Sequence, residues 1–360
     1  MTIAAARPIA RVGLGGQLGR RMKMWTAVSS MTAFGVLVLA AYLMPLGYMA
    51  ATSLKDGAQV SEAAAPLWPA SPAVYTWEGR DYPIYRVPVD GAVHQWALVD
   101  PRREDSTFVD PAHPELGTIE WQGRWRTLEQ SWKFDLRLDN FVTVWQQINF
   151  GRLLLNTFAI ALLGTVGTLL SSIVVAYGFS RFRFPRRDLL FLVLLSTIIL
   201  PFQITLIPTF AVFLSLGWTG TWLPLIVPHF FANAYNVFLL RQYFVTIPRE
   251  LDEAAMIDGA SPLRVLLSVI VPQSMPVIAA VALFHFFFAW NDFFQPLIYL
   301  QGNADAQPLA VGIAVFNALY SQKPTLIQAA ALMTLVVPVT VFFFAQRAFV
   351  RGVVITGVEK

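Results

Sequence analysis

Long stretches without a charged residue constrain the fold of this chain most strongly. A helix that crosses a bilayer needs about 20 consecutive, mostly apolar residues. The stretches that are long enough are 25–54, 153–180, 189–240, 265–291 and 324–346. The chain is 56% hydrophobic and only 13% charged, whereas about 25% of the residues of a soluble domain are charged. The sequence therefore predicts an all-α integral membrane protein.

The third stretch is too long for one crossing. It contains the turn residues Gly217, Gly220 and Pro224, which favour a break between two helices. We also expect Pro201 and Pro208 to bend the first of these two helices. The prediction is then six transmembrane helices, at about 25–54, 153–180, 189–215, 222–241, 265–300 and 324–346.

Basic residues are distributed unevenly over the short segments between these helices. Fifteen Lys and Arg residues fall on one side of the membrane, and the short loops on the other side contain only Lys323. Short loops rich in Lys and Arg remain on the cytoplasmic side. We therefore expect both termini in the cytoplasm, with an N-terminal tail over 1–24 and a C-terminal tail over 347–360.

Residues 55–152 form the one long polar segment, and they contain 14 of the 22 acidic residues. Alternating apolar residues and turn residues predict strands at 82–89, 93–99 and 118–121. Four tryptophans are candidates for a small core: Trp68, Trp77, Trp96 and Trp121. We predict a small β-rich extracytoplasmic insert between the first and second helices. It either docks an extracytoplasmic partner or packs as a decoration on the helices, and both interpretations stay open.

The cytoplasmic loop 245–264 carries helix start and stop signals. Pro248 suits the first position of a helix, and acidic residues follow where the helix dipole favours negative charge. Gly259 suits the left-handed residue that ends a helix, and Ser261 with Pro262 starts a second helix. The pattern predicts a short helix at the water surface. It is either an amphipathic connector or a docking helix for a close partner.

Five residues of this loop resemble the E-A-A-x-x-x-G coupling loop of binding-protein-dependent ABC importer permeases: Glu253, Ala254, Ala255, Asp258 and Gly259. Other segments resemble the carbohydrate-uptake (maltose-type) members of that family, in the same order: 156–157, 176–184, 290–293 and 346–352. The resemblance covers about 25–54 and 134–360. The insert at about 56–133 is longer than this class of subunit usually carries, so the resemblance assigns it no role.

The resemblance implies a type I ABC importer permease fold that translocates a sugar or oligosaccharide across the cytoplasmic (inner) membrane of a prokaryote. It implies that the coupling helix lies in a cleft of a cytoplasmic ATPase subunit, whose closure drives alternating access. Glu253 would be the polar anchor, Ala254 and Ala255 would allow close approach, and Gly259 would fix the turn. The tail residues expected to contact the ATPase are Arg347, Arg351 and Gly352.

The other subunits of such an importer are implied as well. They are a second permease that forms a heterodimer with this chain, two ATPase subunits and an extracytoplasmic solute-binding protein. The chain contains no G-x-x-x-x-G-K-[ST] loop, the motif that cradles nucleotide phosphates. We therefore expect no cofactor and no enzymatic activity on this chain, with ATP and Mg²⁺ on the partner ATPase, and no nucleic-acid partner.

Polar residues inside the apolar stretches are candidates for the solute pathway, because an intramembrane polar group is costly without a function or a partner. The candidates are Asn291, Asp292, Gln295, His229, Asn233, Asn236 and Gln203. Structural alternatives stay open. Asp292 lies near the end of its helix, where solvent or helix contacts can satisfy its carboxylate. His229 and His285 are each the only histidine in an apolar stretch, and each could hydrogen-bond to a neighbouring helix. Residues 302–323 are too short for a clean crossing and predict an external or re-entrant helix.

Other functions fit the sequence less well. An intramembrane hydrolase needs a Gly-x-Ser-x-Gly nucleophile, an H-E-x-x-H zinc site or paired intramembrane aspartates, and none occurs. His94 and His113 lack ligand-like neighbours, so no metal site is expected. An ion-coupled secondary transporter should contain several intramembrane charges. An ABC permease for a non-sugar solute remains the open alternative.

Overall fold

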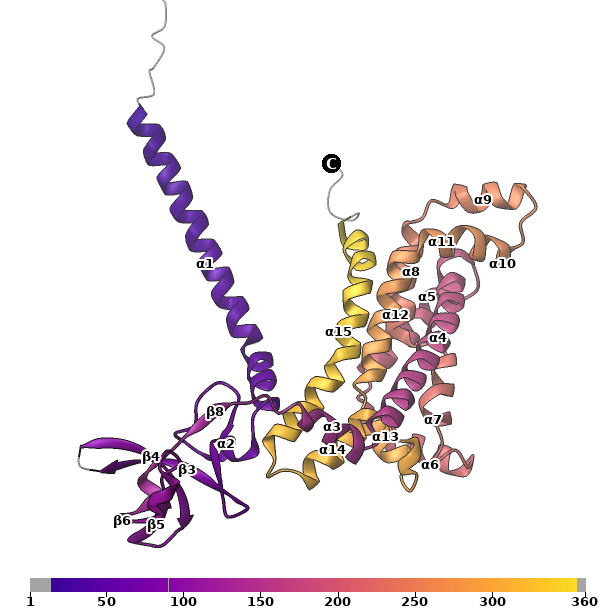
Figure 1. Cartoon of the computed structure of the whole chain (residues 1–360). Helices are drawn as coiled ribbons and strands as arrows, with labels where there is room; N and C mark the ends of the chain where they lie inside the picture. Colours follow the sequence, from indigo (N-terminus) through magenta and orange to yellow (C-terminus); the bar gives the residue numbers. More distant parts are fainter. Residues whose placement is uncertain (1–13, 90, 355–360) are drawn as a thin grey trace, which may run out of the picture.

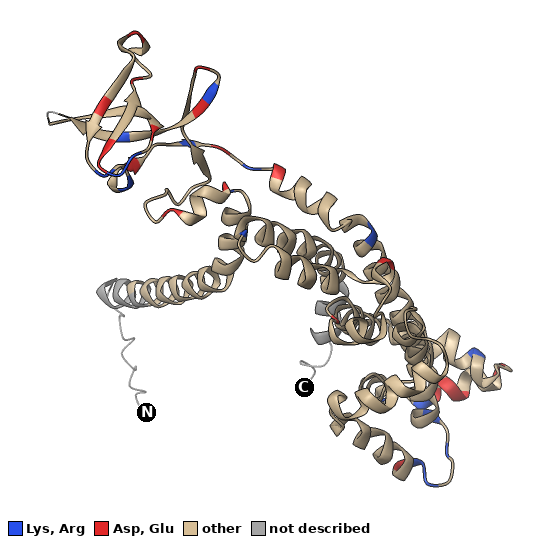
Figure 2. Cartoon of the chain, turned by 90° about the horizontal axis from the view of Figure 1, so that it is seen from below, with Lys and Arg blue, Asp and Glu red and all other residues tan. Residues whose placement is uncertain are grey.

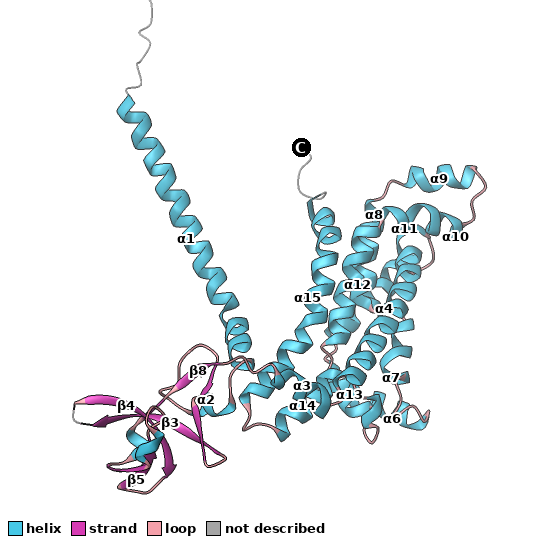
Figure 3. Ribbon diagram, viewed as in Figure 1, coloured by secondary structure: helices cyan, strands magenta, loops and turns pink. Residues whose placement is uncertain are grey.

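The computed structural model describes residues 14–89 and 91–354, with the backbone alone for residues 14–21, 23 and 347–354. The chain forms a bundle of α-helices with a β-rich insert at one end (Figure 1). Strands occur in the insert, and the bundle is helical (Figure 3). The predicted N-terminal tail is helical from Leu14 onward.

The α-helices are α1 (Leu14–Ser53), α2 (Gly57–Ser61), α3 (Asp139–Gln147), α4 (Phe150–Arg181), α5 (Arg187–Ser196), α6 (Phe202–Ser215), α7 (Leu223–Ile226), α8 (Ala234–Thr246), α9 (Arg249–Ile257), α10 (Pro262–Val265), α11 (Val271–Gln273), α12 (Met275–Trp290), α13 (Phe294–Tyr299), α14 (Leu309–Leu319) and α15 (Pro324–Val354). The chain also contains short helical segments: the 3-10 segments η1 (Pro114–Leu116) and η2 (Trp125–Thr127) in the insert, the 3-10 segments η3 (Thr197–Ile199), η4 (Val227–Phe230) and η6 (Ala304–Ala306) in the bundle, and the π segment η5 (Leu266–Ile270).

Several apolar helices have the length of a membrane crossing. Within the described residues, four helices qualify: Met24–Ser53, Phe150–Arg181, Leu223–Thr246 and Pro324–Gln346. Two further pairs of apolar helices are bent, and the number becomes six if each pair is one crossing. The short apolar helix α14 lies within the segment for which the sequence predicted an external or re-entrant helix.

The third predicted crossing is one of the bent pairs. Arg187–Ile199 and Phe202–Ser215 meet at 98°, and Pro201 stands at the break. Proline has no N–H to donate, and its ring clashes with the preceding helical turn. The bend predicted here is therefore confirmed, at the first of the two prolines.

The fifth predicted crossing differs from the expectation of one span over 265–300. Pro262–Gln273 and Met275–Trp290 meet at 81°, because Pro272 and Pro276 flank the break. Helix α12 then ends well before residue 300, and α13 follows as a separate short helix. The expectation of a continuous fifth helix is wrong.

Helix α4 is central to the bundle. It contributes to all three apolar clusters of the bundle, packing with α12, α14 and α15, with α8 to α12, and with α6, α7 and α13. Two glycines let a broken helix pack directly on it. A Cβ atom on Gly167 would lie 2.6 Å from the ring of Phe230, and one on Gly164 would lie 3.1 Å from the ring of His229. Small residues permit such close approach between membrane helices.

The insert contains an antiparallel sheet with the order β2-β3-β4-β5-β6, in which β7 also pairs with β3, and a separate pair of β1 and β8. The strands are β1 (Ala70–Pro72), β2 (Val74–Trp77), β3 (Arg80–Val89), β4 (Ala92–Asp100), β5 (Asp105–Val109), β6 (Thr118–Gln122), β7 (Glu129–Gln130) and β8 (Trp132–Phe134). The three predicted strands correspond to β3, β4 and β6, and the sequence reasoning missed the shorter ones.

The core of the insert consists of buried side chains of β3, β4 and β5. Trp96 is buried, Phe108 is fully buried, and Trp121 packs edge-on against Phe108 with 6.0 Å between the ring centroids. Trp68 is 61% exposed, and Trp77 lies outside the cluster. The predicted core is thus confirmed for two of the tryptophans and wrong for Trp68 and Trp77.

Hydrogen bonds and an ion pair link the first and last residues of the insert where it meets the bundle. The side-chain amide of Asn140 donates hydrogen bonds to the carbonyl oxygens of Ser53 and Lys55, at 2.8 and 3.0 Å. Arg137 lies 3.1 Å from the carboxylate of Asp56. Charged residues are frequent in the insert (Figure 2). The candidate crossings of the bundle are apolar and contain few charged residues, as a bilayer requires.

Replacing the core residue of the insert should unfold the insert and spare the bundle. Phe108→Ala leaves a cavity, and such changes cost about 3–5 kcal/mol. We expect limited proteolysis in mild detergent to cut this variant within 55–152 and to leave the helical remainder intact. Trp68→Ala is the matched control and should be cut like the unchanged protein. Equal protease resistance of both variants would contradict the core described above.

Candidate functional site

Helix α9 forms where the sequence placed start and stop signals. Pro248 precedes it in extended conformation, and acidic residues occupy its first turn, where the helix dipole favours them. Gly259 has φ of +83°. Its N–H donates to the carbonyl of Met256 at 3.0 Å, and the N–H of Ala260 donates to the carbonyl of Ala255 at 2.9 Å. These two bonds are the Schellman pattern, so the predicted glycine stop is confirmed.

A buried ion pair holds α9 against the end of α4. The Nε of Arg181 lies 2.8 Å from Oδ2 of Asp252, and the two side chains are 6% and 9% exposed. A guanidinium NH2 of Arg181 also donates to the carbonyl oxygen of Ile247, at 3.0 Å. Burial raises the pKa of Asp252, while Arg181 and Arg249 act in the opposite direction. The sequence reasoning counted Asp252 only as a dipole charge and missed this partner.

The opposite side of α9 is exposed. Glu253 and Ala254 are exposed, whereas Ala255 is half-buried and packs against the cluster of α4 and α8. Ile257 is 87% exposed, and Leu263 in α10 is also exposed. These two side chains give the exposed face of α9 and α10 an apolar part. Asp258 and Gly259 are exposed at its end.

A hollow of about 270 Å³ lies beside this exposed face. Its lining is Tyr177, Arg181, Phe182, Arg183, Arg249, Asp252, Glu253, Met256 and Pro262. Oδ1 of Asp252 is buried and has no hydrogen-bond partner among the described residues. The hydroxyl of Tyr177 donates to the carbonyl oxygen of Pro262 at 3.1 Å, which fixes the start of α10. The hollow thus joins α4, α9 and α10 into one surface.

The three tail residues predicted beside this surface lie in the last turns of α15, and their side chains are outside the described part. Those residues are Arg347, Arg351 and Gly352. The end of α15 lies at the same end of the bundle as α9, and the insert lies at the opposite end (Figure 1).

The predicted pathway residues centre on a broken helix. The apolar segment Leu223–Thr246 leaves helical geometry at 231–233, between η4 and α8. Asn233 caps α8, and its side chain accepts from the backbone N–H groups of Tyr235 and Asn236 at 2.9 and 3.3 Å. Broken helices are tolerated at membrane depth where other groups satisfy the freed backbone or where they line a cavity.

A cavity of about 350 Å³ opens at this break. Its lining is His229, Asn233, Tyr235, Asn236, Phe284, His285 and Phe288. The rings of His229 and His285 are 4.4 Å apart between centroids, so the view that each stands alone is wrong. The two residues are far apart in the sequence, and no spacing in it indicates the contact. Among the described residues, Nε2 of His285 has no hydrogen-bond partner, and the side chain of Asn236 is buried.

The remaining pathway candidates do not line the cavity at the break. Asp292 and Gln295 line a narrow pocket of about 10 Å³ that also contains His229, and Oδ1 of Asp292 accepts from the backbone N–H of Gln295 at 3.3 Å. Asn291 donates to a carbonyl of its own helix at 2.8 Å. Gln203 is exposed on α6 and lines neither pocket. Among the described residues, no group of three or more His, Asp or Glu side chains is placed to hold a metal ion.

The chain matches a known protein family over a region that contains both the α9 surface and the cavity before α8. A model of the family described as binding-protein-dependent transport system inner membrane component matches residues 167–355. The osmoprotective compounds uptake permease protein GgtD of Synechocystis is 36% identical over 260 residues, which cover 70% of this chain and 85% of that protein. The sn-glycerol-3-phosphate transport system permease protein UgpE of Pectobacterium atrosepticum is 37% identical over 210 residues, which cover 57% of this chain and 73% of that protein.

A solved structure has the same fold. It is a bacterial ABC transporter involved in the import of the acidic polysaccharide alginate, and a chain of it matches with a TM-score of 0.62 at 20% identity. The match covers 91% of this chain and 98% of the other. The chain therefore shares the fold of an ABC importer, with several apolar helices and a β-rich insert.

Removing one partner of the buried ion pair should destabilise the protein. Arg181→Met leaves Asp252 as an uncompensated buried charge, which costs about 3–5 kcal/mol. We expect a lower midpoint of thermal unfolding in detergent, and a midpoint near the original one for Arg181→Met combined with Asp252→Leu. Arg187→Met is the control, since its partner Asp188 is exposed and such pairs contribute about 0–1 kcal/mol. Equal midpoints for the two single variants would show that the pair does not anchor α9.

Proposed function

Because the chain belongs to the family of binding-protein-dependent transport system inner membrane components, we propose that it is a permease subunit of an ABC importer for a sugar or oligosaccharide. One observation carries the proposal. Helix α9 combines an ion-paired inner side with an exposed side that carries Glu253 and Ala254, and it lies at the end of the bundle opposite the insert. Such a helix suits a separate partner protein that binds its exposed side and moves the bundle through it.

The proposed partner at α9 is a cytoplasmic ATPase subunit. Glu253 is its polar anchor, and the exposed Ala254 lets it approach the helix backbone closely. Asp258 and Gly259 form the exposed end of the helix. The half-buried Ala255 serves a different purpose here, because it packs α9 onto the protein's own core. We assign ATP, Mg²⁺ and the hydrolysis to this ATPase. We also assign a contact with it to Arg347, Arg351 and Gly352.

The proposed topology has six crossings, with each bent pair counted as one, and both termini in the cytoplasm. The basic loops support this orientation. It places α9 in the cytoplasm and the insert 55–152 outside. Residues 1–13 and 355–360 of the two proposed tails lie outside the described residues.

A second permease is proposed to cover part of the exposed helix surface. No residue in the most apolar window of α1 is buried, and lipid or another subunit must cover its side chains. We propose a heterodimer with a similar permease, two copies of the ATPase and an extracytoplasmic solute-binding protein. The contact with a solute-binding protein is supported by the structure of an alginate ABC transporter in complex with a periplasmic protein bound to an alginate pentasaccharide, which matches this chain with a TM-score of 0.50 at 18% identity.

The proposed solute site is the cavity at the break before α8. Imidazole and amide groups of His229, His285 and Asn236 hydrogen-bond to hydroxyl groups, and Phe284 and Phe288 offer aromatic faces to the apolar side of a sugar ring. We place Asn233 in a positioning role, because its side chain caps α8. Asp292 and Gln295 line the adjoining narrow pocket, which shares His229 with the cavity. Asn291 and Gln203 line neither of the two, so we do not place them in the solute pathway.

A phosphorylated or other small polar solute is a second candidate. The UgpE relatives are named for sn-glycerol-3-phosphate and the GgtD relative for osmoprotective compounds. sn-Glycerol-3-phosphate shares hydroxyl groups with sugars, and the same side chains of the cavity can hydrogen-bond to these hydroxyls. The proposed transport mechanism is the same for either class.

Charge reversal on the exposed side of α9 should uncouple the importer. Glu253→Lys replaces a negative charge with a positive one in the proposed ATPase contact. This costs several kcal/mol and should reduce the affinity of the chain for the ATPase about a hundredfold or more. Gly259→Pro removes the Schellman N–H and cannot adopt the positive φ. We expect both variants to reach the membrane but to lose solute uptake and co-purification of the ATPase. Asp188→Lys, at an exposed acid of the same end, is the control. Normal import by either α9 variant would refute the coupling assignment.

Loss of a polar group in the cavity should weaken solute handling and leave the coupling intact. Asn236→Leu keeps the side-chain size and removes a hydrogen-bonding group, which is worth about 0.5–1.5 kcal/mol. We expect KM for uptake to rise about three- to tenfold, with unchanged co-purification of the ATPase. Thr205→Val is the control, because its hydroxyl binds a carbonyl of its own helix. An unchanged KM for Asn236→Leu would place the solute elsewhere.

A further inference from the structure

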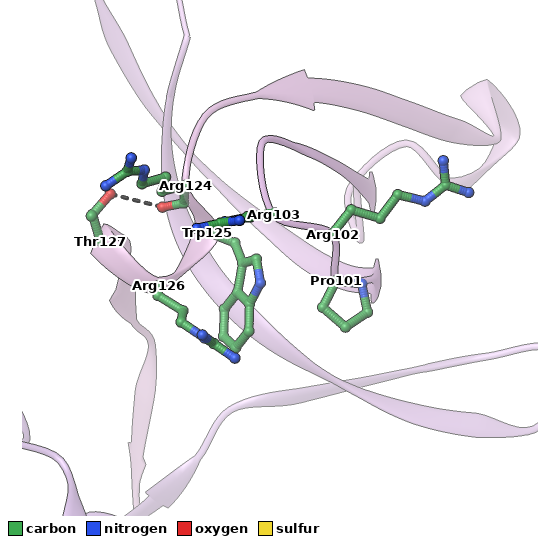
Figure 4. A pocket seen from close by; sticks show the side chains of 7 residues that line it. All are labelled: Pro101, Arg102, Arg103, Arg124, Trp125, Arg126 and Thr127. Carbon is green, nitrogen blue, oxygen red and sulfur yellow. Dashed lines mark hydrogen bonds between the residues drawn. The ribbon is translucent and has the colours of Figure 1, made fainter.

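The insert carries a second hollow that the transport mechanism does not use. It has a volume of about 760 Å³ and is lined by Pro101, Arg102, Arg103, Arg124, Trp125, Arg126 and Thr127. Four of the seven lining residues are arginines, and none is acidic. Figure 4 shows Arg103, Arg124 and Arg126 around Trp125, with Arg102 extending away from them. We propose that this arginine hollow docks a carboxylate-rich surface segment of a protein, which the solute-binding protein of the importer would present.

The two loops that form the arginine hollow are fixed to each other. The N–H of Gly123 donates to the carbonyl oxygen of Glu104 at 2.7 Å. The buried hydroxyl of Ser106 bonds to both the N–H and the carbonyl of Arg102, at 3.1 and 3.0 Å. On the other loop, the hydroxyl of Thr127 donates to the carbonyl of Arg124 at 2.8 Å, the dashed line in Figure 4. The positions of the arginines are therefore set by the fold.

Most of this positive charge is uncompensated. Arg102 pairs with Asp100 at 2.9 Å, and Arg126 lies over the ring of Trp125 at 5.3 Å. Among the described residues, no ion pair involves Arg103, Arg124 or Arg126. The insert as a whole contains 14 acidic and 10 basic residues. The hollow is thus a positive region on an otherwise acidic unit, which orients a negatively charged partner.

The geometry favours a protein segment over a single small anion. All four arginines are exposed, and an exposed ion pair contributes at most about 1 kcal/mol. Firm binding therefore needs several carboxylates at once, spaced around a hollow much larger than one anion. Guanidinium groups bind carboxylates with two parallel hydrogen bonds. The hollow also lies on the insert, away from the cavity at the break before α8, so a solute in transit does not need to enter it.

The assignment of this partner rests on the proposed function, which places the insert on the extracytoplasmic side. The binding chemistry can be tested without transport. The full-length chain in nanodiscs of neutral phosphatidylcholine is titrated with fluorescein-labelled hexaglutamate, and binding is followed by fluorescence anisotropy. The test variant is Arg103→Glu with Arg124→Glu. The control is Arg80→Glu with Lys133→Glu, which makes the same change of net charge at exposed positions of the same insert.

We expect the test variant to bind hexaglutamate about tenfold more weakly than the unchanged chain, and the control to bind nearly as the unchanged chain does. The difference should shrink as the salt approaches about 0.15 M, where screening acts over ~8 Å. Equal affinity for the test variant and the control would overturn the proposal. Trigalacturonate that binds more tightly than the peptide, and only when the arginines are present, would also overturn it, in favour of an acidic solute.

Failure of the docking proposal is distinguishable from failure of the proposed function. If the peptide shows no preference for the arginine hollow while the ATPase still co-purifies with the chain, only the docking site is wrong. If a membrane-impermeant protease reaches the insert from the cytoplasmic side alone, the proposed topology is wrong, and the hollow cannot meet a solute-binding protein. Protease resistance of the insert in both double variants confirms that they are folded.

Discussion

The ion pair between Arg181 and Asp252 connects α9, the helix proposed to dock a partner, to the bundle that contains the proposed solute cavity. Arg181 is the last residue of α4, and α4 belongs to all three apolar clusters of the bundle. Asp252 is the buried residue of α9. On the proposed function, a force on the exposed side of α9 would reach the centre of the bundle through this largely buried contact. A buried pair is costly to break, which suits a joint that must stay rigid during each cycle.

The same central helix shapes the proposed pathway. Gly164 and Gly167 of α4 leave room for the broken segment before α8, and the hydroxyl of Ser171 donates to the carbonyl of His229 at 3.0 Å. In a bilayer, an irregular backbone persists only where it is buried in protein or lines a cavity. Here it lines a cavity, and the rings of His229 and His285 meet beside it. The proposed coupling surface and the cavity thus depend on two parts of one helix: its C-terminal end at Arg181 and its middle at Gly164, Gly167 and Ser171.

The crossings, the β-character of the insert and the ends of α9 follow from local signals in the sequence: uncharged runs, alternation, Pro248 and Gly259. The bend at Pro201 follows from one residue. The pair of Arg181 with Asp252 and the meeting of His229 with His285 do not, because each depends on how distant segments pack. The same holds for Trp68 and Trp77. The number of tryptophans suggests a core, but which of them the sheet buries depends on the register of its strands. The coupling role of Glu253 came from resemblance to a family and remains a proposal.

The absence of cysteine from the sequence permits a direct test of the central claim. Ala254→Cys introduces a single thiol on the exposed side of α9, and a short cysteine-linked photo-crosslinker can be attached there in native membranes. Mass spectrometry then identifies the crosslinked protein. The account predicts a crosslink to an ATPase subunit, which is absent when the cysteine is placed at exposed Trp68 of the insert instead. Crosslinks from position 254 to lipid or to the insert of another copy, with none to an ATPase, would contradict it.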